Sequence, residues 1–255
     1  MAEQRVSIYS LRLRSLVSVL LLLSAWELAA RMHLTPPLFL PPFSVVAMQL
    51  GRSLADGTLV ADLALSLYRT FAGLALAAAA GVLIGMLMAQ SRFVHWMIDP
   101  IVALAFPAPK IAFIPVFILW FGIESLSKIL LVAFACVFPV IIGTYSAARS
   151  VNRIFLWSAF SLGTSKTALL GRVILPACYP RIFATLRIAL PVALITTFTA
   201  EMVAGGGGMG ATLIYSQRFF ESPTVYAYIV IMLCVGLVLD AAMVKFQSRY
   251  LAWSE

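Results

Sequence analysis

Six apolar segments constrain the fold of this chain more than any other feature. A helix needs about 20 mostly apolar residues to cross a bilayer, and segments of that kind lie near 16–32, 63–88, 97–121, 129–148, 182–203 and 225–246. Charged residues make up only 11% of the chain, whereas soluble domains carry about 25%. We therefore predict an all-α transmembrane fold, with residues 1–255 forming a single transmembrane domain.

Two of these segments have unusual features. The third contains Pro107, Pro109 and Pro115, and each proline removes a backbone donor. Irregular backbone at membrane depth is tolerated inside protein or beside a cavity, so we expect this segment to lie inside an assembly. The first segment follows two arginines, as a secretory signal does. Because Glu27 and Arg31 follow it without a clear cleavage site, we expect an uncleaved helix.

The basic residues predict how the chain is oriented. With six spans and an internal N-terminus, twelve of the 18 Lys and Arg residues fall on the inner side. This bias predicts that both termini are cytoplasmic. The loops 33–62 and 205–223 are then external, and Ser44 is expected to cap a short helix through Leu54 in the first of them.

Several other classes of function are disfavoured. The net charge of +8 is explained by short basic loops and anionic lipid headgroups, so no nucleic-acid partner is expected. The three cysteines lack metal-ligand spacing and are expected to be small hydrophobes, with no metal site. A literal GxGxxG within 205–210 follows no strand, so it predicts a turn that ends a helix rather than a dinucleotide site.

A polar and basic island at 151–181 separates the fourth and fifth segments. Asn152 is expected to cap a first helix, Gly163 to break it, and Thr164 or Ser165 to cap a second helix. The second helix is expected to end at two prolines, Pro176 and Pro180. The island therefore predicts a helical hairpin on the inner side of the membrane.

Within this hairpin, Gly163 followed by Val173-x-Leu175-Pro176 resembles the signature of bacterial ABC importer permeases, usually written EAA, then Gly, then I-x-L-P. Other stretches are similar, in order, to the nitrate/sulfonate/taurine-type permease group, from about residue 27 to residue 249. They are Phe106 to Pro115, Leu119 to Ile123, Ser127 to Ile129, Leu186 to Leu190, Ala200 to Met202, and Leu237 to Asp240.

The resemblance implies a type I ABC importer permease whose cytoplasmic hairpin couples it to an ATPase. The residues it assigns to this contact are Trp157, Ser158, Ala159, Gly163, Thr164, Ser165, Lys166, Val173, Leu175 and Pro176. One position departs from the signature, because Trp157 stands where the family has the Glu that is thought to meet the ATPase. An apolar anchor at Trp157 is one way to replace that contact.

The resemblance also implies the partners. No Walker-type phosphate loop occurs in the chain, so ATP and Mg²⁺ are expected on a separate subunit and the chain is expected to bind no cofactor and to be no enzyme. Two ATPase subunits, a second permease copy and an external, periplasmic binding protein complete the expected importer. It would lie in the bacterial inner membrane and carry nitrate, a sulfonate, taurine or a similar small solute.

Polar residues within the spans are candidates for the translocation pathway or for structural bridges. Thr197 and Glu201 are four residues apart and share one helix face, although Glu201 near a helix end needs no partner if water reaches it. The full set of pathway candidates is Pro107, Pro109, Lys110, Thr196, Thr197 and Glu201. Candidates for a structural charge bridge are Asp99, Arg187 and Asp240.

Two alternative functions remain open from the sequence. Broken helices and ionisable residues at membrane depth are also typical of a secondary transporter or channel that acts without an ATPase. The absence of a clear inverted repeat disfavours that class. A membrane-embedded enzyme is disfavoured further, because no nucleophile–base pair or His/Cys/Asp cluster shares one depth.

Overall fold

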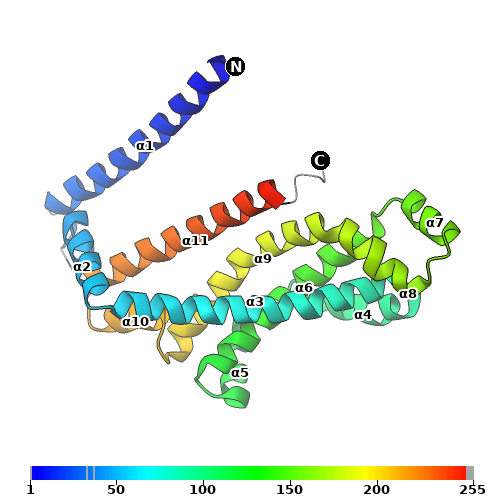
Figure 1. Ribbon diagram of the computed structural model, residues 1–255. Helices are drawn as coiled ribbons and strands as arrows, with labels where there is room; N and C mark the ends of the chain where they lie inside the picture. Colours follow the sequence, from blue (N-terminus) through cyan, green and yellow to red (C-terminus); the bar gives the residue numbers. More distant parts are fainter. Residues whose placement is uncertain (1, 33, 37, 251–255) are drawn as a thin grey trace. The chain divides into compact units, whose positions relative to one another are not determined.

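The computed structural model describes residues 2–32, 34–36 and 38–250, with side chains left out for 2–16, 153, 166, 167 and 250. Throughout these residues the chain consists of helices and loops (Figure 1). The helices are α1 (Ala2–Arg31), α2 (Phe43–Ala55), α3 (Thr58–Gln90), α4 (Arg92–Ala105), the 3₁₀ turn η1 (Lys110–Phe113), α5 (Ile114–Phe121), α6 (Ser125–Arg149), α7 (Arg153–Ser161), α8 (Lys166–Leu169), the π turn η2 (Leu170–Ile174), α9 (Leu175–Ala204), α10 (Met209–Arg218) and α11 (Ser222–Tyr250).

Among the residues that the structure describes, four helices are long and apolar enough to cross a membrane. They cover Thr58–Gln90, Ser125–Arg149, Leu170–Ala204 and Ser222–Arg249, which matches the second, fourth, fifth and sixth predicted segments. The all-α transmembrane prediction is thereby confirmed. The first segment lies within α1, and its crossing of the membrane stays a prediction.

The third predicted segment is not a straight span. α4 and the pair η1–α5 are bent by 93° relative to one another, and only as a bent pair do they qualify as a fifth span. The break lies at Pro107 and Pro109, where two missing backbone donors within three residues prevent a continuous ladder. Pro115 does not break α5, because it stands in the first turn, where a proline costs no hydrogen bond.

The chain divides into two compact units, and each is described by itself. Unit 1 comprises residues 1–60 and 213–231, and unit 2 comprises residues 61–212 and 232–255. In unit 1, the indole of Trp26 donates to the Pro41 carbonyl over 3.0 Å and its ring lies 5.4 Å from that of Tyr226. Tyr226 in turn donates to the Phe39 carbonyl over 2.8 Å. These contacts hold the proline-rich stretch against two helices. The prediction of one domain over 1–255 stays a prediction.

The start of α2 differs from the sequence prediction. The helix begins at Phe43 and Ser44 does not cap it. Instead the Glu27 carboxylate accepts hydrogen bonds from the Ser44 backbone N–H at 3.0 Å and from its hydroxyl at 2.9 Å. A carboxylate from another helix therefore satisfies a free N–H group in the first turn of α2, where negative charge is also favoured by the helix dipole.

The core of unit 2 lies where α3, α6 and α9 meet. Small residues allow these helices to approach closely, as is common between helices in membranes. A Cβ atom added at Gly143 of α6 would lie 2.2 Å from the Thr185 hydroxyl of α9, and one at Gly73 of α3 would lie 2.6 Å from Val132. The core side chains are Leu74, Ala77, Val132, Cys136, Val140, Ala189, Leu190 and Ala193.

The end of α10 carries backbone strain. Phe220 has φ 59° and is the one non-glycine residue with positive φ that the described part of the chain contains. The Glu221 N–H donates to the Ser216 carbonyl and the Phe220 N–H donates to the Gln217 carbonyl, which is the Schellman arrangement that normally has glycine at the position of Phe220. A bulky residue in this conformation costs roughly 1–2 kcal/mol.

We predict that Phe220→Gly raises the free energy of unfolding by about 1 kcal/mol, because glycine adopts this conformation without the Cβ clash. Thermal unfolding of the detergent-purified protein measures the change. Phe219→Gly is the matched control, since it removes a neighbouring exposed ring without relieving strain and is expected to lower stability. Equal effects of the two substitutions would refute the assignment of strain to Phe220.

Candidate functional site

The island at 151–181 begins with two short helices joined by a tight turn, α7, residues 162–165 and α8, which together are called the elbow. The Asn152 side chain caps α7 by accepting from the Ile154 N–H at 2.9 Å. α7 ends in a Schellman turn with Gly163 at φ 79°, in which the Thr164 N–H donates to the Ala159 carbonyl and the Gly163 N–H to the Phe160 carbonyl. Ser165 then caps α8 by accepting from the Ala168 N–H at 3.3 Å. Of the two predicted caps for the second helix, Ser165 is therefore the one used.

The second arm of the elbow differs from the prediction. Pro176 and Pro180 do not end it, because α8, η2 and α9 follow one another without a loop as far as Ala204. The π turn at 170–174 lies immediately before Pro176, and its wider hydrogen bonding, in which the Leu175 N–H donates to the Leu170 carbonyl, precedes the missing proline donor. The island is thus connected to a membrane helix by continuous helical backbone.

One face of the elbow lies against the rest of unit 2. Leu156 of α7 and Leu170 and Ile174 of η2 line a hollow of about 170 Å³ together with residues at the C-terminal ends of α3 and α6. The opposite face of α7 is open, with Ile154 and Trp157 exposed. Ser158 and Gly163 are also exposed, whereas Ala159, Thr164, Val173, Leu175 and Pro176 are partly buried. The backbone of Lys166 belongs to α8, and its side chain lies outside the described residues.

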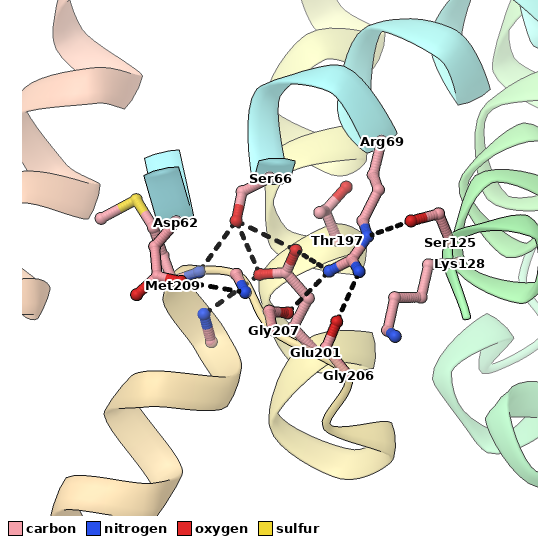
Figure 2. Close-up of polar contacts among 12 residues, drawn as sticks. Asp62, Ser66, Arg69, Ser125, Lys128, Thr197, Glu201, Gly206, Gly207 and Met209 are labelled. Atoms are coloured by element: carbon pink, nitrogen blue, oxygen red, sulfur yellow. Dashed lines mark hydrogen bonds and ion pairs between the residues drawn. The ribbon is translucent and has the colours of Figure 1, made fainter. Parts of the chain in front are cut away.

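At the other end of α3, α6 and α9, the structure contains a buried ion pair (Figure 2). The guanidinium of Arg69 donates to the Glu201 carboxylate over 2.8 Å, and the two side chains are 1% and 0% exposed. Ser66, one turn before Arg69, also donates to this carboxylate, with 2.8 Å to the nearer oxygen. Arg69 further donates to the Ser125 hydroxyl at 3.1 Å. One ion pair therefore joins the N-terminal ends of α3 and α6 to the C-terminal end of α9.

The glycine run 205–210 wraps around this pair. The carbonyls of Gly206 and Gly207 each accept from Arg69 at 2.7 Å, and the N–H of Gly210 donates to Glu201 at 3.1 Å. The predicted turn is present, since Gly205 ends α9. The run has a further role, because a Cβ added at Gly208 would lie 2.3 Å from a Glu201 carboxylate oxygen. Glycine is needed here for close approach and for φ 96°.

Lys128 of α6 is a second buried cation beside the pair, as Figure 2 shows. Its side chain is 1% exposed and its ammonium donates to the Ile123 carbonyl at 2.6 Å. The fully buried Glu201 is paired with Arg69, whereas Lys128 has a backbone carbonyl as its acceptor. The partly buried Asp62 accepts from the Gly208 N–H at 3.3 Å and the Thr212 hydroxyl at 2.6 Å. Polar groups of the glycine run complete the satisfaction of this charge cluster.

The pathway candidates are divided between two places. Thr196, Thr197 and Glu201 lie together on α9, with the Thr197 hydroxyl 2.9 Å from that of Thr70. The expectation that Glu201 needs no partner is wrong, because it is buried and ion-paired. Pro107, Pro109 and Lys110 lie at the bend after α4, where both prolines are exposed and Lys110 donates to the Phe106 carbonyl. Contact of any of these residues with a solute stays a prediction.

Of the three candidates for a structural charge bridge, Arg187 and Asp240 form an ion pair and Asp99 lies elsewhere. Arg187 of α9 donates to Asp240 of α11 through Nε at 2.9 Å and through Nη2 at 3.2 Å. This two-point geometry is that of a strong guanidinium–carboxylate pair. Asp99 is elsewhere, with a carboxylate oxygen 3.9 Å from the ring of His95, four residues earlier on α4.

Sequence reasoning missed Arg69, Ser66 and Lys128. A signal was present, because Arg69 lies within an otherwise apolar span, and charges at membrane depth are usually paired. Glu201 is the complementary charge on the fifth span. The pairing of these two residues follows from charge alone, whereas the wrapping of the glycine run around them depends on loop geometry that no residue pattern specifies.

Similarity to known proteins identifies the family of this chain. Residues 81–251 match the family model described as "Binding-protein-dependent transport system inner membrane component". The chain belongs to this family. It is 34% identical over 244 residues to the taurine transport system permease protein TauC of Escherichia coli K12, which covers 94% of this chain and 89% of the relative. It is 28% identical over 241 residues to the putative aliphatic sulfonates transport permease protein SsuC of Bacillus subtilis 168, with 94% and 87% covered.

Solved structures confirm the fold of the family. A chain of the MetNI methionine ABC transporter in an inward-facing conformation matches with a TM-score of 0.67 at 16% identity, over 76% of this chain and 96% of that one. The chain is therefore a membrane-spanning transport permease with the type I importer fold, and the resemblance found in the sequence is confirmed.

We predict that removing either partner of the buried pair, as in Arg69→Leu or Glu201→Gln, lowers the free energy of unfolding by about 3–5 kcal/mol, because the remaining polar group is left buried and unpaired. Thermal unfolding in detergent measures the loss. Arg187→Leu is the matched control, since that pair is 39% and 48% exposed, and its loss is expected to be about 0–1 kcal/mol. A larger loss at Arg187 than at Arg69 would contradict the prediction.

We predict separately that Gly208→Ala disrupts the charge cluster, since both the contact with Glu201 and the positive φ oppose a methyl group. The expected result is reduced yield of folded protein and a lower melting temperature. Gly51→Ala is the control, because nothing lies within 4 Å of the added methyl there and alanine favours the exposed helix α2 by roughly 0.5–1 kcal/mol. Unchanged stability of Gly208→Ala would show that the glycine run is not closely packed.

Proposed function

We propose that this chain is the permease subunit of an ATP-driven importer for a small organic anion of the sulfonate class, such as taurine. The observation that supports this most directly is the elbow α7–α8, in which α7 presents an open face and α8 continues through η2 into the membrane helix α9. Such an arm transmits force from a partner into the bundle through rigid contacts. The named relatives support the solute class, since one transports taurine and another is assigned to aliphatic sulfonates.

The proposed orientation places the elbow in the cytoplasm. Arg92 at the start of α4 and Arg149 at the end of α6 lie next in sequence to the helix ends beside the elbow, and the elbow segment itself adds four more basic residues, Arg153, Lys166, Arg172 and Arg181. Positive charge is concentrated in cytoplasmic loops of inner-membrane proteins. The glycine run and the Arg69–Glu201 pair then lie toward the external side, where an external binding protein would release the solute.

The remaining subunits follow from the proposed mechanism. ATP and Mg²⁺ bind to two ATPase subunits, and this chain binds neither and catalyses no reaction. Each chain carries one elbow, so two copies are needed to receive the closing motion of two ATPase subunits, and a homodimer is the simplest arrangement. Exposed apolar side chains on α11, among them Leu233, Leu237 and Val238, are then covered by lipid or by the second copy.

Isolation of the tagged chain from membranes of its own host tests the class of transporter. We expect a protein that carries a phosphate-binding loop to be recovered with the tagged chain, in an amount equal to that of the chain. The isolated complex should hydrolyse ATP. Repeated isolation of the chain without an ATPase, combined with uptake that persists after ATP depletion, would instead indicate a secondary transporter or channel.

We predict that cysteine labelling in intact cells places the elbow inside. In a chain whose own cysteines are replaced, an impermeant maleimide should label Ser222→Cys, at the start of α11, and should label Ser158→Cys on α7 only after the membrane is opened. Ser158 is exposed and Ser222 is partly buried, so labelling of both after the membrane is opened is the control that each thiol can react. Labelling of Ser158→Cys in intact cells would exclude contact with a cytoplasmic ATPase.

A further inference from the structure

The open face of α7 is apolar, whereas a surface that binds another protein through charge pairs carries charged side chains. Ile154 and Trp157 are three residues apart on one face of the helix and are 61% and 63% exposed. Leu156 lies on the opposite face, against the hollow beside α3 and α6. The open face therefore presents two bulky apolar side chains that the rest of unit 2 leaves exposed.

Acidic groups are absent from the whole segment. Residues 151–181 contain no Asp or Glu, and the nearest acidic residues in the sequence are Glu124 and Glu201. Glu201 is buried in its pair with Arg69. A partner surface that is complementary to an acidic side chain at the position of Trp157 would instead contact an indole with basic residues nearby in the sequence.

From these observations we infer that the ATPase subunit engaged by this chain has an apolar socket that receives Trp157 and Ile154, with acidic side chains at its rim. This inference rests on the proposed function and specifies the chemistry of its partner. A basic side chain on the floor of the socket would be desolvated by the indole without gaining a partner, which is costly. Acidic rim groups complement the four basic residues of the segment, of which Arg172 is exposed.

The elbow is suited to present such an anchor. α7 is capped at Asn152 and closed by the Schellman turn at Gly163, and its inner face is held by Leu156. Little conformational freedom remains to be lost on binding, so a single buried aromatic residue contributes strongly to affinity. Tryptophan is among the residues most enriched at such positions.

The test uses the ATPase subunit recovered with the full-length wild-type chain, purified on its own, and measures its Kd for detergent-solubilised variants. We expect Trp157→Phe to stay within about threefold of wild type and Trp157→Ala to bind at least about tenfold more weakly. Trp157→Glu, which restores the acidic residue of the family signature, should bind more weakly still. Trp120→Ala is the control, because Trp120 of α5 is similarly exposed, at 68%, and should leave the Kd unchanged.

The rim is tested by salt and by charge reversal. Arg172→Glu should weaken binding several-fold at low salt and by less at high salt, since exposed charges are screened. Tighter binding by Trp157→Glu than by wild type, or wild-type binding by Trp157→Ala, would overturn the apolar socket while leaving the proposed function intact. Failure of the wild-type chain to bind any ATPase subunit would instead overturn the proposed function itself.

Discussion

The ion pair between Arg69 and Glu201 is the interaction on which the arrangement of unit 2 depends. The two charges are fully buried beside an apolar core, where an unpaired charge would cost several kcal/mol. This cost is avoided only when α3, α6, α9 and the glycine run are all in place, since each supplies a hydrogen bond to the pair. The pair therefore favours one packing of these helices over alternatives in which the charges separate.

The two ends of the bundle are built on different principles. At the end with the glycine run, polar groups are buried and mutually satisfied, and glycines allow the backbone to reach them. At the end with α7, the backbone is closed by helix caps while apolar side chains remain exposed. Continuous helix from Lys166 to Ala204 joins the two ends. In the proposed importer, this helix is the route by which ATP-driven motion reaches the external side.

The sequence predicted the parts of this structure that depend on local chemistry. Apolar length identified the second, fourth, fifth and sixth predicted spans. The capping residues Asn152 and Ser165 and the breaker Gly163 located the elbow within a residue. The course of the backbone at prolines was predicted less well. Pro176 ends no helix because a π turn lies before it, whereas Pro107 and Pro109 bend their segment by 93°. Whether a proline breaks a helix depends on packing around it, and neighbouring sequence does not specify that packing.

Long-range polar contacts were predicted least well. Ser44 has the right type for a helix cap, yet Glu27 from another helix occupies that role. Glu201 was assigned to water because it is near a helix end, and its burial results from tertiary packing of α3 and the glycine run. Such partners are distant in sequence, and residue type alone left several pairings open, as Asp99 and Asp240 did for Arg187.

Uptake by proteoliposomes distinguishes an ATP-driven importer from a transporter that acts without an ATPase. Vesicles would contain this chain and its ATPase subunit, with the external binding protein outside and radiolabelled taurine as solute. We expect uptake that requires ATP inside and the binding protein outside and that is unaffected when ion gradients are collapsed. Uptake by the chain alone, driven by an ion gradient without ATP, would contradict it.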